Sequence, residues 1–172
     1  GCLKGEVAQK FVNGDDAGAI AAAKWYQDLF GKEFYALEVM ENGLDEQRLV
    51  NEKLFRLAKE IDAPVVATGD CHYLRKEDAS PHDALLCIGT GKLLAEPNRM
   101  KFNNDGYYLK SSSEMAKEWR HYPEAVKASL AVAEKAHLKF DFGKYHFPIY
   151  PGSKEAGAPT LDETMAHQAR EG

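Results

Sequence analysis

Residues 63–74 read Ala-Pro-Val-Val-Ala-Thr-Gly-Asp-Cys-His-Tyr-Leu, and this stretch decides the fold. The apolar run behind Pro64 is typical of a buried strand in a parallel sheet or barrel. Asp70 and His72 follow two residues apart, so on an extended chain their side chains share a face. Barrel and open-sheet folds place their chemistry at the carboxyl ends of such strands. The pattern predicts a metal-binding pair, with acid–base chemistry as the alternative.

The same two residues also have a purely structural interpretation. An aspartate at a strand end often caps the next turn, and a histidine beside it is often only its hydrogen-bond partner. The pattern Asp-x-His is too short to decide between a structural pair and a metal site. Both interpretations stay open on these residues alone.

The segments before this stretch predict the fold class. Residues 34–40 form an aromatic and aliphatic run that indicates a buried strand. Residues 44–61 carry an apolar stripe at helical spacing, with Asp45 and Glu46 in the first turn, where negative charge suits the helix dipole. Strand, helix and strand in this order predict a βαβ unit with parallel strands. The predicted fold class is therefore α/β.

The rest of the chain predicts further helices and one short strand. Helices are expected at residues 4–12, from a cap at Asp15 or Asp16 to Phe30, from Ser80-Pro81 to residue 88, from a cap at Ser112 or Ser113, and at residues 123–136. Residues 107–110 indicate a short strand. Gly89-Thr90-Gly91 fails the spacing of glycine-rich phosphate loops and is interpreted as a helix stop. Trp25 and Tyr26 are expected to pack in the core.

Length and composition limit the classes of function. A chain of 172 residues is long enough for one domain with a core, and its net charge of −5 argues against gripping nucleic acid by itself. Three cysteines without disulfide spacing indicate a reducing compartment, so we expect a cytoplasmic protein. No apolar run approaches the roughly 20 residues that span a bilayer, so no membrane partner is expected. Because the sequence starts without Met, we expect a piece of a longer polypeptide.

Five segments together resemble a known family. They are GCLKGE at residues 1–6, FYALEV at 34–39, ATGDCHYL at 67–74, HDALLCIGTGK at 82–92 and FGKYHFP at 142–148. In this order they resemble motifs of the polymerase and histidinol phosphatase (PHP) domain, in the form found in bacterial replicative DNA polymerase III alpha subunits. The resemblance extends from residue 1 to about residue 150, and the set is far more specific than any single motif.

The resemblance implies a domain organisation. The fold is expected to be part of a distorted (β/α) barrel of the PHP type, followed by a linker and the start of the next (palm) domain. Residues 1–150 would be the C-terminal part of the PHP domain, residues 151–159 a Gly/Pro/Ser linker, and residues 160–172 the start of the next domain. The N-terminal His-x-His motifs that complete the family's metal site are not in this sequence.

The resemblance also implies a ligand set. It maps Cys2 onto the family's cysteine ligand, and Asp70 and His72 onto its final Asp-x-His pair. Thiolate, carboxylate and imidazole together suit zinc better than magnesium. Asn42 stands where family members often carry a histidine, and Glu38 is a carboxylate in an apolar run whose role as ligand, supporting group or salt-bridge member is open. With most ligands missing, we expect the fragment alone to be inactive.

The activity implied for a complete site is 3′→5′ exonuclease proofreading by phosphodiester hydrolysis, with zinc or mixed divalent metals. It would act in cis with a DNA-directed DNA polymerase that uses magnesium. The implied partners are the rest of the same polypeptide, primer–template DNA and other replisome subunits. The alternative is a catalytically silent structural platform for the polymerase. A stand-alone PHP phosphatase such as histidinol phosphatase fits least, because residues 82–148 resemble the polymerase-associated form.

Overall fold

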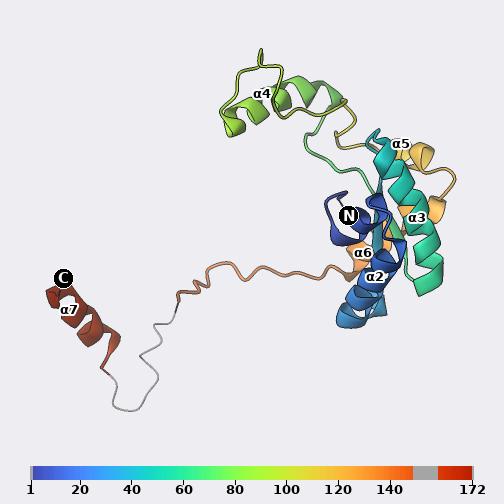
Figure 1. Cartoon of the computed structure of the whole chain (residues 1–172). Coiled ribbons are helices and arrows are strands. Elements are labelled where there is room, and N and C mark those ends of the chain that lie inside the picture. Colours follow the sequence, from blue (N-terminus) through green and yellow to red (C-terminus); the bar gives the residue numbers. More distant parts are fainter. Residues whose placement is uncertain (1, 149–158, 172) are drawn as a thin grey trace. The chain divides into compact units, whose positions relative to one another are not determined.

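The computed structural model describes residues 2–148 and 159–171 (Figure 1). The described residues form an α/β structure, as the sequence predicts. The helices are α1 (Glu6–Val12), α2 (Asp16–Phe30), α3 (Asp45–Ile61), α4 (Ala79–Thr90), α5 (Ser112–Glu118), α6 (Pro123–Lys135) and α7 (Leu161–Glu171). The strands are β1 (Leu37–Met40) and β2 (Val65–Thr68), and the short 3-10 helices are η1 (Lys32–Phe34) and η2 (Lys76–Asp78).

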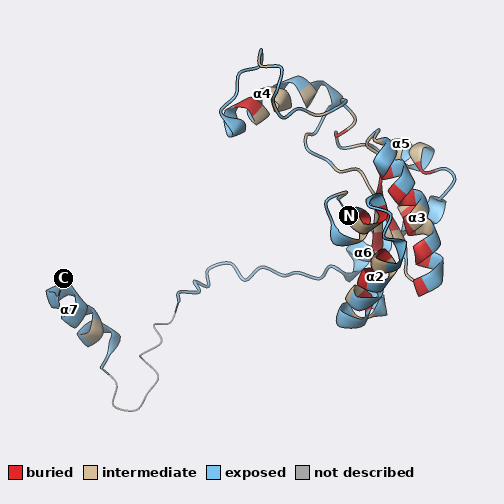
Figure 2. Cartoon of the chain, viewed as in Figure 1, coloured by how far each residue is buried: buried red, intermediate tan, exposed pale blue. Residues whose placement is uncertain are grey.

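The two strands pair in parallel, in register from Leu37 opposite Val65 to Met40 opposite Thr68. The connection between them is α3, so the predicted βαβ unit is confirmed. Helix α3 lies against β1, and α6 lies against β2. Figure 2 shows buried residues along α3 and none over most of α4. The two strands therefore form the centre of the core, with α1, α2, α3 and α6 packed around them.

The start of α2 follows the sequence prediction, and Tyr26 is partly buried against Tyr35, but Trp25 does not follow it. The Asp15 carboxylate accepts a hydrogen bond from the Gly18 amide at 2.9 Å, which confirms Asp15 as the cap. The side chain of Trp25, predicted in the core, is 58% exposed. The reason is that the buried face of α2 is built from small residues such as Ala19 and Ala23, which let α1 approach closely.

The segment after β2 differs from the sequence prediction in two details. Residues 107–110 do not form a strand: a single parallel bridge joins Tyr108 to Tyr73. Helix α5 is capped by Ser111, one residue earlier than expected. The predicted stop of α4 is confirmed, because the helix ends at Thr90 and Gly91 adopts a left-handed backbone with φ 64°.

The chain divides into two compact units, Gly1–Ala136 and His137–Gly172. The second unit contains α7, in the segment expected to start the next domain. Most of the predicted linker lies outside the described residues, so the proposed boundaries near residues 150 and 159 stay predictions. All of the side chains considered below belong to the first unit.

Candidate functional site

Asp70 and His72 lie just beyond the carboxyl end of β2. The strand ends at Thr68, and Asp70 has a left-handed backbone with φ 49°. The prediction that Asp70 and His72 share a face because the chain is extended is therefore wrong: the backbone turns at Asp70. The turn at Asp70 nevertheless brings them together: the His72 Nδ1 lies 3.9 Å from the Asp70 Oδ1. Both side chains are about one-third exposed, so solvent and solutes reach the pair.

The hydrogen bond of the His72 ring defines which of its nitrogens is free to act. Nδ1 lies 2.7 Å from the backbone carbonyl oxygen of Asp70, so Nδ1–H donates to this oxygen. In the neutral ring this leaves the lone pair on Nε2. Metal-binding histidines are commonly oriented in this way, by donating the second ring N–H to a carbonyl. The Phe102 ring packs edge-on against His72, at a centroid distance of 4.7 Å.

Asn42 joins the carboxyl end of β1 to Asp70. Its Nδ2 donates to the Asp70 Oδ2 at 3.2 Å. Its Oδ1 is buried and accepts no hydrogen bond within the described parts of the chain. The two strand ends therefore meet as the sequence predicts, with an amide beside the carboxylate at the place where the resemblance implies an imidazole.

A loop at residues 103–107 contacts the residues that follow both strands, and the sequence alone does not predict these contacts. Asn104 Nδ2 donates to the backbone oxygen of Asn42 at 2.9 Å, and the His72 amide donates to the backbone oxygen of Tyr107 at 2.8 Å. Burial raises the pKa of the Tyr107 phenol, and the negative charge of Asp70 raises it further. The run Asn103-Asn104-Asp105-Gly106 is typical of a turn, but its contacts with Asn42 are not readable from the sequence.

Cys2 precedes α1 in the first unit. Its side chain is exposed, and Sγ accepts a hydrogen bond from the Lys4 amide at 3.5 Å. Cys2 and Glu38 line one cavity of about 350 Å³, whose lining does not include Asp70 or His72. Within residues 2–148 and 159–171, no group of three or more His, Cys, Asp or Glu side chains is placed to hold a metal ion. The role of Cys2 as a ligand stays a prediction.

The donors at the strand ends fit a metal in type but not in number. Carboxylate oxygen and imidazole nitrogen are both zinc ligands, and a structural zinc site takes four such ligands. Asp70 and His72 would supply two of them. A complete site would need side chains beyond those that the structure brings together here.

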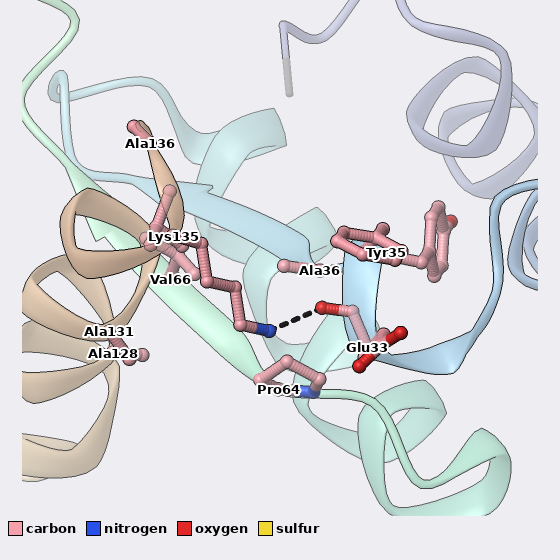
Figure 3. A pocket seen from close by; sticks show the side chains of 11 residues that line it. Glu33, Tyr35, Ala36, Pro64, Val66, Ala128, Ala131, Lys135 and Ala136 are labelled. Atoms are coloured by element: carbon pink, nitrogen blue, oxygen red, sulfur yellow. Dashed lines mark hydrogen bonds between the residues drawn. The ribbon is translucent and has the colours of Figure 1, made fainter. Parts of the chain in front are cut away.

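A separate apolar cavity of about 260 Å³ lies between the sheet and α6. Figure 3 shows Pro64 and Val66 on one side of it and Ala128 and Ala131 of α6 on the other. The Lys135 ammonium donates to the backbone oxygen of Glu33 across its rim. Apart from Glu33 and Lys135 its lining is apolar or aromatic, so it offers no pair of groups suited to hydrolysis.

No helix among the residues that the structure describes combines the length and apolar character that a bilayer span requires.

The amino-acid sequence is similar to proteins of one name from several bacteria. No family model matches the chain. It is 39% identical over 154 residues, 88% of its length, to the DNA polymerase III subunit alpha of Mycobacterium tuberculosis. It is 39% identical over 149 residues to the subunit of the same name from Treponema pallidum, and 32% identical over 171 residues, 98% of its length, to that from Pseudomonas aeruginosa. The chain spans 13–14% of the length of these relatives. Over nearly all of its length, the chain is homologous to a segment of DNA polymerase III subunit alpha.

Proposed function

We propose that this chain is the C-terminal part of the PHP domain of a replicative DNA polymerase, and that it contributes Asp70 and His72 to a metal-dependent 3′→5′ exonuclease centre. The observation that carries the proposal is the arrangement of the His72 ring. Its Nδ1–H is held by the Asp70 carbonyl at 2.7 Å, with the Asp70 carboxylate 3.9 Å from the same nitrogen, so Nε2 would be the atom free to bind a metal.

In this proposal the remaining ligands come from other parts of the parent polypeptide. The two-stranded sheet is compatible with a piece of a distorted (β/α) barrel whose other strands lie outside this chain. Cys2 would join the site as a thiolate in the complete domain. Zinc or mixed divalent metals, when bound, would supply an activated water and charge stabilisation at phosphorus. The parent polymerase would use magnesium and bind primer–template DNA and other replisome subunits.

The roles of this chain's own residues are then limited and specific. Asp70 would hold a negative charge at the site, and the Asn42 amide would orient its Oδ2 through the 3.2 Å hydrogen bond. His72 would present a neutral Nε2. The loop that contains Tyr107 would fix the backbone of His72 through the 2.8 Å hydrogen bond between the two main chains.

The second candidate is a structural platform without hydrolytic activity, and Asn42 favours it. The Asn42 amide donates to an oxygen of Asp70 that a ligating carboxylate could otherwise give to a metal. The described residues also place no third His, Cys, Asp or Glu side chain with the pair to hold a metal ion. The platform would support the polymerase through the fold alone.

The substitution Asp70→Asn in the natural polypeptide separates the two candidates. It keeps the shape of the side chain and removes its charge. If the pair is catalytic, the rate of removal of a mismatched primer end falls at least about a hundredfold, and bound zinc falls, because a ligand is lost. Extension of a matched primer serves as the control for folding.

Asp28→Asn is the matched control, since Asp28 is an exposed carboxylate on α2. It is expected to change neither mismatch removal nor zinc content. If Asp70→Asn behaves like Asp28→Asn in both measurements, the exonuclease proposal is wrong and the platform is the function of this segment.

A further inference from the structure

A second polar cavity lies next to His72, at the start of α4. It has a volume of about 290 Å³, and its polar lining residues are Tyr73, Ser80, His82, Asp83, Lys101 and Asn104. We call it the α4 cavity. The rings of His72 and His82 both pack against Phe102, at centroid distances of 4.7 and 4.8 Å, and the two histidine rings lie 5.8 Å apart. The α4 cavity therefore adjoins the candidate site.

The charges that line the α4 cavity leave one cation uncompensated. Asp83 accepts two hydrogen bonds from the Arg99 guanidinium, at 2.5 and 2.7 Å, so these two charges cancel. Lys101 forms no ion pair with any residue that the structure describes, although its charge acts on Asp83. The Arg99–Asp83 pair also fastens the segment that carries Lys101 to α4. The neutral pair thus holds the cavity in shape, and Lys101 is the cation of its lining that forms no ion pair among the described residues.

Two further groups in the lining form no hydrogen bond among the described residues of the first unit: the Ser80 hydroxyl and the ring nitrogens of His82. The His82 ring packs against Tyr73 and Phe102, and its charge acts on Asp83. Asn104, in contrast, already donates to Asn42 and accepts from the Gly106 amide. An ammonium, a hydroxyl and an imidazole N–H, gathered around one cavity, suit an anion with several oxygen acceptors.

We propose that the α4 cavity binds a phosphate group, held by Lys101, Ser80 and His82, beside His72. This inference rests on the proposed exonuclease function, because it places a phosphate of the DNA strand, or of the released nucleotide, next to the hydrolytic pair. Its chemistry is nevertheless independent of the metal: none of the three side chains is a proposed ligand.

Lysine footprinting in the natural polypeptide tests the proposal. An amine-acetylating reagent modifies Lys101, and mass spectrometry measures the rate at that position with and without ligand, in the presence of a metal chelator. One arm uses deoxyadenosine monophosphate and the other a short single-stranded oligonucleotide. At about ten times the Kd, mass action leaves about a tenth of the site free, so acetylation of Lys101 is expected to slow about tenfold.

Protection by the mononucleotide identifies the released product as a ligand, and protection by the oligonucleotide alone identifies the strand. Lys127, an exposed lysine on α6, is the internal control, and its rate should not change. Lack of protection of Lys101 in both arms overturns the proposal.

The double variant Ser80→Ala, His82→Leu separates binding in the cavity from simple coverage of the surface by DNA. Loss of two hydrogen bonds to a charged phosphate lowers affinity on the order of a hundredfold, so protection at the same ligand concentration should disappear. Protection that persists unchanged in this variant overturns the proposal. Asp70→Asn should leave protection intact, so failure of the exonuclease function and failure of the α4 cavity give different results.

Discussion

At the scale of single residues, Asp70 is constrained by its backbone as well as by its charge. Its φ of 49° lies in the left-handed region, which aspartate, asparagine and glycine adopt far more readily than other residues. The same conformation turns the chain so that the Asp70 carbonyl reaches the His72 ring at 2.7 Å. One residue thus supplies the turn, a carboxylate and the acceptor that orients the imidazole.

Asn51 is a buried side chain that holds the end of β1, and its substitution is expected to lower the free energy of unfolding. Its Nδ2 donates to the Met40 backbone oxygen at 2.7 Å, and its Oδ1 accepts from Gln47 at 3.0 Å; both side chains are buried. Asn51→Ala leaves two buried polar groups unpaired, so the free energy of unfolding of the βαβ unit should fall by about 2–4 kcal/mol. Hydrogen exchange of the α3 amides in the natural polypeptide measures this change.

Asn98→Ala is the control for that substitution, because Asn98 is exposed. Its effect on exchange in α3 should lie within about 0.5 kcal/mol of zero. An equally small effect of Asn51→Ala would show that water or Gln47 replaces the lost hydrogen bonds.

At the scale of elements, the cap of α5 predicts a pH dependence. The Ser111 hydroxyl and amide and the Tyr108 hydroxyl all donate to Glu114, and they lower the pKa of its carboxyl from 4.5 to about 2. A depressed pKa in the folded state gives stability that is present above the unfolded value of 4.5 and lost as the pH falls towards about 2. Helix α5 should therefore loosen over this acidic range.

Trp119, which is buried at the end of α5, reports this loosening. In a Trp25→Phe background it is the remaining tryptophan of the two in the chain. Its fluorescence in dilute solution should change between pH 4.5 and about 2, while Glu114→Gln should remove that dependence and show a weaker helix at neutral pH. The same acid transition in both proteins would contradict the assignment of the shift to Glu114.

The sequence predicts an element well when the interactions that form it join residues close together in the chain, and poorly when they join distant residues. The helix α3, the Asp15 cap and the stop before Gly91 depend on residues within a few positions, and the sequence predicts them correctly. The segment 107–110 depends on which residue it meets, and it forms one bridge to Tyr73 instead of a strand. The α4 cavity likewise depends on the Arg99–Asp83 ion pair, which joins residues 16 positions apart and cannot be predicted from a local sequence pattern.

At the scale of the whole molecule, the described sheet has few strands, and many large apolar side chains are exposed to solvent. The described residues contain two strands, and a two-stranded sheet is marginal without further strands or covering elements. Large apolar side chains such as Ile88 on α4 and Leu93 after it are 78% and 71% exposed. Unpaired strand edges and exposed apolar groups both favour association with other chains.

The chain produced alone is therefore expected to self-associate, whereas the longer polypeptide proposed above, whose other parts would cover these surfaces, is not. Light scattering coupled to size-exclusion chromatography compares the two at equal concentration, and Ile88→Lys should reduce the association of the isolated chain. A monodisperse, monomeric isolated chain would show that the two strands and their helices need no further cover.

The loop at residues 103–107, which hydrogen-bonds to Asn42 and His72, is synthesised after both strands, so the site forms late in synthesis. Asn103 and Asn104 bond to Asn42 from 61 and 62 positions away, and the amide of His72 bonds to the carbonyl of Tyr107. A ribosome makes both strands and the Asp70–His72 pair well before it makes these partners. The pair thus reaches its final arrangement only after the chain has been extended past the residues that hold it, so nascent chains that end earlier carry the residues of the site without its geometry.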